Sequence, residues 1–109
     1  MMHRMAVAAA AAVILSAGAA AAADPASCKT VQFSDVGWTD ITATTALAST
    51  VLKGLGYTPK TDVLSVPVTY AALKSKNIDV FLGNWMPTME ADIKPYREDK
   101  SVEVVGVNL

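Results

Sequence analysis

Both tryptophans of the sequence follow a glycine at the end of a strand-like stretch. Trp38 lies in the stretch GWTD, and Trp85 lies in the stretch GNWMP. Two indoles at one rim of a sheet can face each other across a pocket, where their negative faces attract a trimethylammonium group or a similar cation. Each such contact contributes ~0.5 to 2 kcal/mol, so useful affinity requires two or more. The pattern leaves open the alternative that each indole only covers the sheet edge as packing.

Two polar residues stand beside the tryptophans. Asp40 can balance the charge of a cation or accept a hydrogen bond from a ligand hydroxyl, and either Asp40 or Thr39 can cap the next helix. Asn84 can orient a polar ligand group, although turn chemistry is the favoured explanation for an asparagine there. The candidate ligand-binding residues are therefore Trp38, Asp40, Asn84 and Trp85. Other side chains that we expect only to pack are Tyr57, Tyr70, Tyr96, Met86 and Met89.

Catalytic and metal-binding chemistry finds no support in the sequence. The only histidine is His3, which belongs to an N-terminal leader, so no histidine is left for a triad or a metal site. The carboxylates are scattered without an acid–base pair, and there is no glycine-rich phosphate loop. We therefore expect a protein that is not an enzyme and that uses neither a cofactor nor a metal.

Residues 1–23 have the pattern of a secretory signal peptide. Arg4 precedes an alanine-rich apolar run, which ends in three alanines before Asp24. A membrane anchor is the rival interpretation, but the strongly apolar part is short for a span of ~20 residues. We expect cleavage after Ala23 and export to the periplasm. Residues 24–109 carry eight basic and ten acidic side chains, and a net charge of −2 does not suit binding to nucleic acid.

Cys28 is the one cysteine of the sequence. In an oxidising compartment a lone thiol indicates a missing partner, which would be a cysteine outside this chain. A buried and inert thiol is the other interpretation, and the sequence does not decide between them.

Strand-like and helix-like stretches alternate after the leader. Alternating or apolar β-branched residues predict strands, and apolar positions on one face predict helices. The resulting order is β-α-β-α-β-α-β, an α/β fold with a doubly wound, mostly parallel sheet. Ligands of such sheets bind at the carboxyl ends of the strands, where both tryptophans are expected. The predicted strands are residues 30–36, 62–66, 78–83 and 102–107, and the predicted helices are residues 41–55, 69–75 and 88–94. We expect Pro67 to close the second strand and Pro95 to end or kink the third helix.

The stretches FSDVGWTDITATTA and DVFLGNWMPTMEADIKPY resemble the periplasmic binding proteins of ABC importers for choline and glycine betaine. The resemblance runs in register from Ser27 over the rest of the chain. It implies two α/β lobes of the type II periplasmic-binding-protein kind, which close on a quaternary ammonium ligand inside a box of aromatic rings. It also implies that Trp38 and Trp85 are two walls of that box, and that Asp40 contacts the hydroxyl end of choline. The implied partners are a membrane permease and an ATPase subunit.

Proteins of this family are much longer than the present chain. The resemblance therefore implies that residues 24–109 are the N-terminal part of the first lobe. The second lobe, the other walls of the box and any partner of Cys28 would follow Leu109. Choline is favoured over glycine betaine because Asp40 would repel a betaine carboxylate nearby. The alternative is a truncated, non-functional fragment that cannot hold ligand alone, because indoles without a closing lobe leave the cation solvated.

Overall fold

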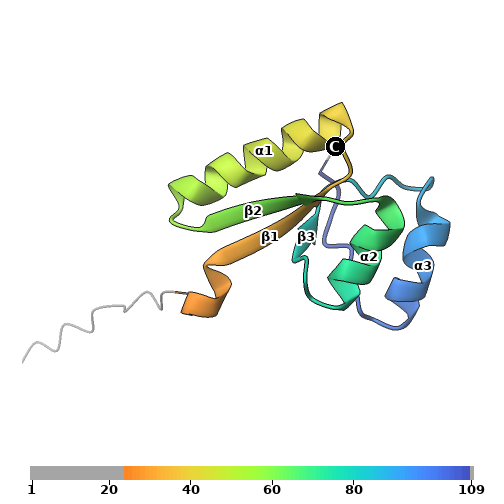
Figure 1. Ribbon diagram of the computed structural model, residues 1–109. Helices are drawn as coiled ribbons and strands as arrows, with labels where there is room; N and C mark the ends of the chain where they lie inside the picture. The colour runs from red at the N-terminus through yellow and green to blue at the C-terminus, as the bar shows by residue number, and fades with distance from the viewer. Residues whose placement is uncertain (1–23, 109) are drawn as a thin grey trace, which may run out of the picture.

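The computed structural model describes residues 24–108, so the expected signal peptide lies outside the described residues. Three strands form one parallel sheet in the order β2-β1-β3 (Figure 1). The predicted α/β class with a parallel sheet is confirmed. The elements are the short 3-10 helix η1 (Ala26–Cys28), β1 (Thr30–Asp35), α1 (Thr39–Gly54), β2 (Thr58–Val63), α2 (Val66–Lys74), β3 (Val80–Phe81) and α3 (Glu90–Glu98).

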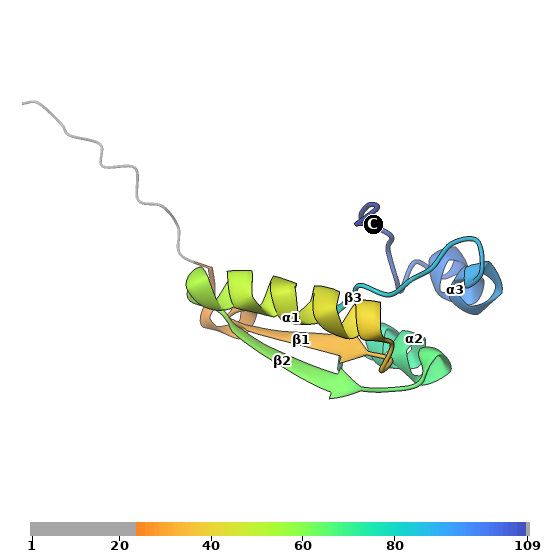
Figure 2. The ribbon, with the colours of Figure 1, turned by 90° about the horizontal axis from the view of Figure 1, so that it is seen from above.

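Two neighbouring residues at the end of β1 show that helices cover both faces of the sheet. Ser34 Oγ lies 2.6 Å from Thr69 Oγ1 of α2, whereas the carboxylate of Asp35 accepts a hydrogen bond from Thr42 of α1. Successive side chains of a strand point to opposite faces of its sheet. α1 and α2 therefore pack on opposite faces, and Figure 2 shows α1 running along β1 and β2 while α2 lies beyond the ends of these strands. This is the doubly wound arrangement that the sequence predicts.

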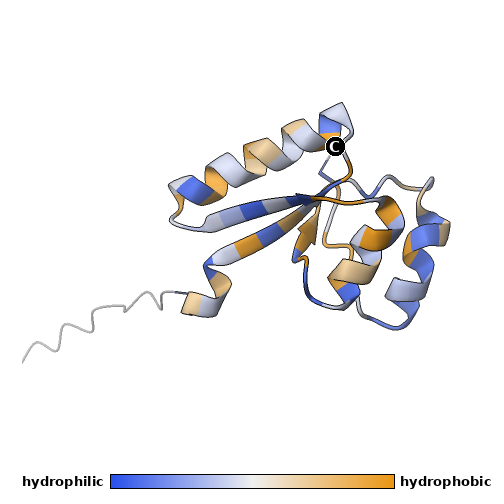
Figure 3. Ribbon diagram, viewed as in Figure 1, coloured by the Kyte–Doolittle hydropathy of each residue, from blue (hydrophilic) through white to orange (hydrophobic). Residues whose placement is uncertain are grey.

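The hydrophobic core is small and gathers around β1 and β3. Tyr70 of α2 is 1 % exposed and packs edge-on against Phe81, with 6.0 Å between the ring centroids. Figure 3 shows hydrophobic residues on β3 and α2, whereas β2 is largely hydrophilic. The interior therefore lies on the β1–β3 side of the sheet. The buried hydrophobic side chains are Phe33, Ile41, Tyr70, Ile78, Met89 and Ile93.

The position of β2 differs from the prediction. The expected strand was residues 62–66, but β2 spans Thr58–Val63 and pairs with β1 along its whole length, from Thr30 opposite Thr58 to Asp35 opposite Val63. Most residues of β2 are exposed, because it is an edge strand of the described sheet. Its sequence therefore lacks the apolar signal on which the prediction relied.

Pro67 acts differently from the prediction, and Pro95 does not end the third helix, which was one of the two outcomes expected there. Pro67 does not close a strand but lies in the first turn of α2, where a missing amide hydrogen leaves no helical bond unmade. α3 continues through Pro95 to Glu98 instead of ending there. Ala91, whose carbonyl loses its usual helical donor at Pro95, is exposed, so water can satisfy that carbonyl. Among residues 24–108, no helix is both long enough and apolar enough to cross a bilayer.

The other two predicted strands are shorter than expected or unformed. β3 contains only Val80–Phe81, although its expected neighbours Ile78 and Gly83 are both buried. Residues 102–107 form no strand in the described chain. A strand needs a neighbour for its backbone hydrogen bonds, whereas Val105 and Val107 are 95 % and 94 % exposed. The prediction of a fourth strand is therefore wrong for the described residues.

Gly83 lies two residues after β3, in the segment before Trp85, and has no room for a side chain. A Cβ atom there would lie 2.8 and 2.9 Å from ring atoms of Phe81 and 3.0 Å from Cγ1 of Ile41. We expect Gly83→Ala to lower the free energy of unfolding by ~1–3 kcal/mol, the usual cost of overpacking a core. Gly54→Ala is the matched control, because a Cβ at Gly54 meets nothing within 4 Å. Urea unfolding of both variants tests the contact, and equal stabilities would contradict it.

Candidate functional site

The turn from β1 into α1 is organised by the buried carboxylate of Asp35. Its Oδ1 accepts a hydrogen bond from the amide of Gly37 at 2.9 Å, and its Oδ2 accepts one from the hydroxyl of Thr42 at 2.6 Å. Gly37 has a φ of 78°, a left-handed conformation that glycine adopts without steric cost. The chain therefore turns sharply at Gly37 and places Trp38 at the start of α1.

Asp40 lies in the first turn of α1 but does not cap it. The capping position is Trp38, and the structure has no side-chain hydrogen bond for the cap. The expectation that Thr39 or Asp40 caps the helix is therefore wrong, because α1 begins at Thr39 and includes both residues. Asp40 is exposed, and its negative charge is favourable near the positive end of the helix dipole. The carboxylate is thus available at the surface two residues from Trp38.

The turn after β3 is organised by Tyr70 and Met89. The hydroxyl of Tyr70 donates a hydrogen bond of 2.5 Å to Oδ1 of Asn84. The amide of Trp85 donates to Sδ of Met89 at 3.3 Å, and the amide of Met89 donates to the carbonyl of Trp85 at 2.8 Å. Burial, reinforced by the charge of Asp92, raises the pKa of Tyr70 to about 12, so its hydroxyl stays a donor at neutral pH.

The two indoles touch each other at this edge of the sheet. Their ring centroids lie 4.8 Å apart with an angle of 41° between the planes. The expectation that they face each other across a pocket is wrong, because this separation leaves no space for a trimethylammonium group between the rings. Trp38 is 37 % exposed and Trp85 is 45 % exposed, so each also presents aromatic surface outward. Together they form a continuous aromatic surface, which we call the indole pair.

The structure brings the four candidate residues to one edge of the sheet in two pairs. Trp38 and Asp40 start α1, and Asn84 and Trp85 follow β3. The sequence reasoning missed Asp35 and Tyr70, whose side chains hold the two turns. A buried aspartate two residues before a glycine is a recognisable turn signal for Asp35, whereas no local pattern connects Tyr70 with Asn84.

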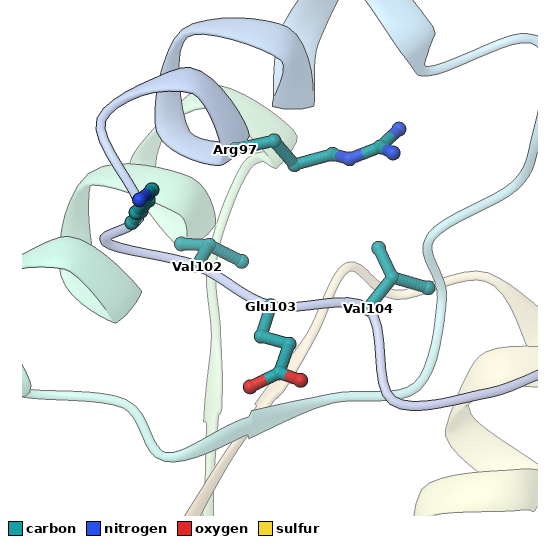
Figure 4. A pocket seen from close by; sticks show the side chains of 5 residues that line it. Arg97, Val102, Glu103 and Val104 are labelled. Atoms are coloured by element: carbon teal, nitrogen blue, oxygen red, sulfur yellow. The ribbon is translucent and has the colours of Figure 1, made fainter.

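Two hollows on the described surface lie at α3, and neither is lined by the indole pair. One of about 420 Å³ lies between α3 and the segment that follows it (Figure 4). Its lining carries charges of both signs and no aromatic ring, so it offers a quaternary ammonium ligand no cation–π contact. Residues 24–108 also contain no cluster of side chains that could ligate a metal ion. The lining residues of this hollow are Arg97, Lys100, Val102, Glu103 and Val104.

Cys28 is exposed at the end of η1. The interpretation of Cys28 as a buried thiol is therefore wrong, whereas its pairing with a cysteine outside this chain stays a prediction.

Thr42 and Thr44 allow a matched test of the Asp35 turn. Thr42→Val would leave one oxygen of a buried carboxylate without its donor, so we expect a loss of ~1–3 kcal/mol in the free energy of unfolding. Thr44 only donates to the carbonyl of Asp40 within the same helix, so Thr44→Val should change stability by less than about 0.5 kcal/mol. Thermal unfolding measures both variants. A Thr42→Val variant as stable as Thr44→Val would show that the Asp35 bonds do not support the turn.

Known proteins resemble this chain over most of its length. One solved structure is an ABC-transporter choline binding protein in complex with choline, which is 75 % identical with a TM-score of 0.75. Another is an ABC-transporter choline binding protein in an unliganded semi-closed conformation, which is 76 % identical with a TM-score of 0.71. Each match covers 76 % of this chain and 29 % of the solved chain.

A curated relative and a family model also match this chain. The relative is an uncharacterized protein, ORF1, of Chromohalobacter salexigens, 54 % identical over 84 residues, which cover 77 % of this chain and 54 % of the relative. The chain thus spans about half the length of this relative and less than a third of the solved ones. The family model is described as the substrate binding domain of an ABC-type glycine betaine transport system, and it matches residues 29–109. The chain belongs to this family of ABC-transporter substrate-binding domains, and the resemblance read from its two tryptophan stretches is confirmed.

Proposed function

We propose that this chain forms part of the solute-binding component of an ABC importer, and that it contributes to capturing choline. The single observation that carries the proposal is the indole pair beside Asp40 at the carboxyl edge of the parallel sheet. The family is one of transporter binding components and not of enzymes. Glycine betaine is the next candidate ligand, because it carries the same trimethylammonium group.

The indole pair supports a shared cation site on its outer side. A cation is attracted when it lies within about 6 Å of a ring centroid. The centroids are 4.8 Å apart, so one cation can lie within this range of both rings without entering the space between them. In this proposal Trp38 and Trp85 are adjacent walls of an aromatic box, and Asn84 orients a polar group of the ligand. The remaining walls would come from polypeptide outside the described residues.

Asp40 supports choline over glycine betaine. Choline carries one positive charge and a hydroxyl, which can donate a hydrogen bond to a carboxylate. Glycine betaine carries its own carboxylate, which Asp40 would repel. The exposed position of Asp40 near Trp38 leaves its oxygens available to a ligand on the indole pair. We infer from this charge pattern that Asp40 contacts the hydroxyl end of choline.

The transport context follows from the family. A periplasmic binding protein delivers its ligand to a membrane permease driven by an ATPase, and we propose these subunits as partners. Export to the periplasm agrees with the leader pattern of residues 1–23. We propose cleavage after Ala23, so that residues 24–109 begin the first lobe. A disulfide of Cys28 with a later cysteine is part of the same proposal.

The alternative, a fragment that cannot hold ligand alone, is favoured by the exposure of the indole pair. A cation–π contact at an exposed site contributes only ~0.5–1 kcal/mol. Two such contacts fall short of the ~4 kcal/mol that corresponds to a millimolar dissociation constant. This chain can therefore contribute to choline capture only if further polypeptide closes the site around the cation.

The first test separates these two possibilities by calorimetric titration with choline. We expect no measurable heat from the 109-residue chain, because its indole pair is open to water. We expect saturable binding from a chimera in which residues 24–109 replace the matching segment of the solved choline-binding relative. The chimera without binding would overturn the proposed function. Micromolar binding by the chain alone would overturn the fragment alternative.

Variants of the tryptophans in the chimera test the chemistry of the site. We expect Trp85→Leu to weaken choline binding about tenfold or more, because a desolvated cation–π contact contributes up to ~2 kcal/mol. Trp85→Phe keeps an aromatic face and should lose less affinity. The same ranking is expected at Trp38. Equal losses for leucine and phenylalanine would mean that these rings only pack, which is the interpretation that the sequence left open.

The role of Asp40 is tested by its amide variant in the same chimera. Asp40→Asn should weaken choline binding by about ten- to a hundredfold, because a hydrogen bond to a charged group contributes ~1.5–3 kcal/mol. Glycine betaine binding should stay unchanged or improve, because a repulsive charge is removed. Asp62→Asn on β2 is the matched control, since its amide oxygen can still accept the hydrogen bond that Gln32 donates. Equal losses for both ligands would remove Asp40 as the discriminating residue.

A further inference from the structure

We propose that Tyr70, which lies on α2 and outside the candidate binding residues, is the positioning residue for Trp85 and thereby sets the geometry of the indole pair. This inference rests on the proposed function for its consequence in ligand binding. Its structural part, the control of the two indoles, does not depend on any ligand.

The hydroxyl of Tyr70 lies buried beside the turn that carries Trp85. Tyr70 is 1 % exposed, and its ring is fixed by Phe81 and by Tyr96, whose centroid lies 5.7 Å away in a stacked arrangement. Its hydroxyl donates to Oδ1 of Asn84 at 2.5 Å. Asn84 is the residue directly before Trp85, so this bond fixes the backbone from which the indole extends.

Tyr70 also contacts Met89, which holds the backbone of Trp85. The hydroxyl of Tyr70 lies 3.5 Å from Sδ of Met89, and the same sulfur accepts the amide of Trp85 at 3.3 Å. The amide of Met89 returns a hydrogen bond to the carbonyl of Trp85. The Trp85 backbone is therefore held on both sides by groups that touch one phenol. Tyr70 and Met89 are 1 % and 4 % exposed, so the contact between the phenol and the thioether is shielded from water.

α2 contacts both segments that lead to the tryptophans through two adjacent residues. Thr69, next to Tyr70, is fully buried and bonds Ser34, which precedes the Asp35 turn and Trp38. The two residues thus connect α2 with the strand before Trp38 and with the turn before Trp85. The two indoles that follow these segments lie 4.8 Å apart. Of the two, only Tyr70 acts on a residue adjacent to its tryptophan.

The test uses Tyr70→Phe, which keeps the packed ring and removes only the hydroxyl. Tyr96→Phe is the matched control, because the described structure gives the Tyr96 hydroxyl no hydrogen bond. In the 109-residue chain, exciton coupling between the two indoles is measured by circular dichroism, with Trp38→Phe as the reference for its complete loss. We expect Tyr70→Phe to reduce the coupling to less than about half, and Tyr96→Phe to leave it unchanged at the same helical content.

The second measurement is choline affinity in the chimera described above. We expect Tyr70→Phe to weaken binding about tenfold, and Tyr96→Phe to change it by less than twofold. Tyr70→Phe added to Asn84→Ala should cause little further loss, because residues that act through one another are not additive. Additive losses, or normal indole coupling together with normal affinity in Tyr70→Phe, would overturn the positioning role.

The outcomes separate this inference from the proposed function. A chimera that fails to bind choline overturns the function, and the indole coupling then decides the role of Tyr70 alone. If Tyr96→Phe reduces the coupling as much as Tyr70→Phe, the effect comes from ring packing in general, and the inference is overturned. If the 109-residue chain shows no indole coupling even before substitution, the coupling is measured in the chimera instead. Loss of coupling in both tyrosine variants, or in neither of them, then overturns the inference.

Discussion

The buried carboxylate of Asp35 needs hydrogen-bond donors from within the protein, and this requirement determines how the chain is arranged at the edge of the sheet. Asp35 is 5 % exposed, and the ion pairs within residues 24–108 join residues of α2, of α3 and Asp99, which directly follows α3. A buried charge without an opposite charge depends on hydrogen bonds to offset its lost hydration. The amide of Gly37 and the hydroxyl of Thr42 supply these bonds. They also fix how α1 leaves the sheet, and so where Trp38 and Asp40 come to lie.

The turn after β3 is also held by a buried polar group, which here is a neutral hydrogen-bond donor. The buried hydroxyl of Tyr70 and the thioether of Met89 replace the carboxylate, and the chain leaves β3 in a fixed direction. The two turns belong to strands that are neighbours in the sheet, β1 and β3. The indoles meet because both strands end at one edge and each has its own buried anchor. The surface that carries the proposed ligand contacts is thus defined by residues that we do not expect to touch a ligand.

Residue patterns predicted the parts of the fold that depend on local chemistry. A glycine one or two residues before a tryptophan, after a strand-like stretch, located both turns. The alternation of strands and helices placed these turns at one edge of a parallel sheet. The bounds of β2 and the state of residues 102–107 were not predictable in this way, because they depend on which strand lies alongside. The contact between the indoles and the bond from Tyr70 to Asn84 depend on side-chain geometry between segments far apart in the sequence. Local periodicity carries no information about either.

The parallel sheet also determines when the indole pair can form during folding. Trp38 and Trp85 are separated along the chain by α1, β2, α2 and β3, and parallel strands cannot be joined by a tight hairpin. Closing so long a loop costs chain entropy before any contact between its ends compensates for it. The aromatic surface is therefore a late product of folding, and the local turns at Gly37 and Gly83 can exist well before it. Newly made chains would pass through a stage with two exposed and separate indoles, in which the nearby apolar segments are still open to other chains.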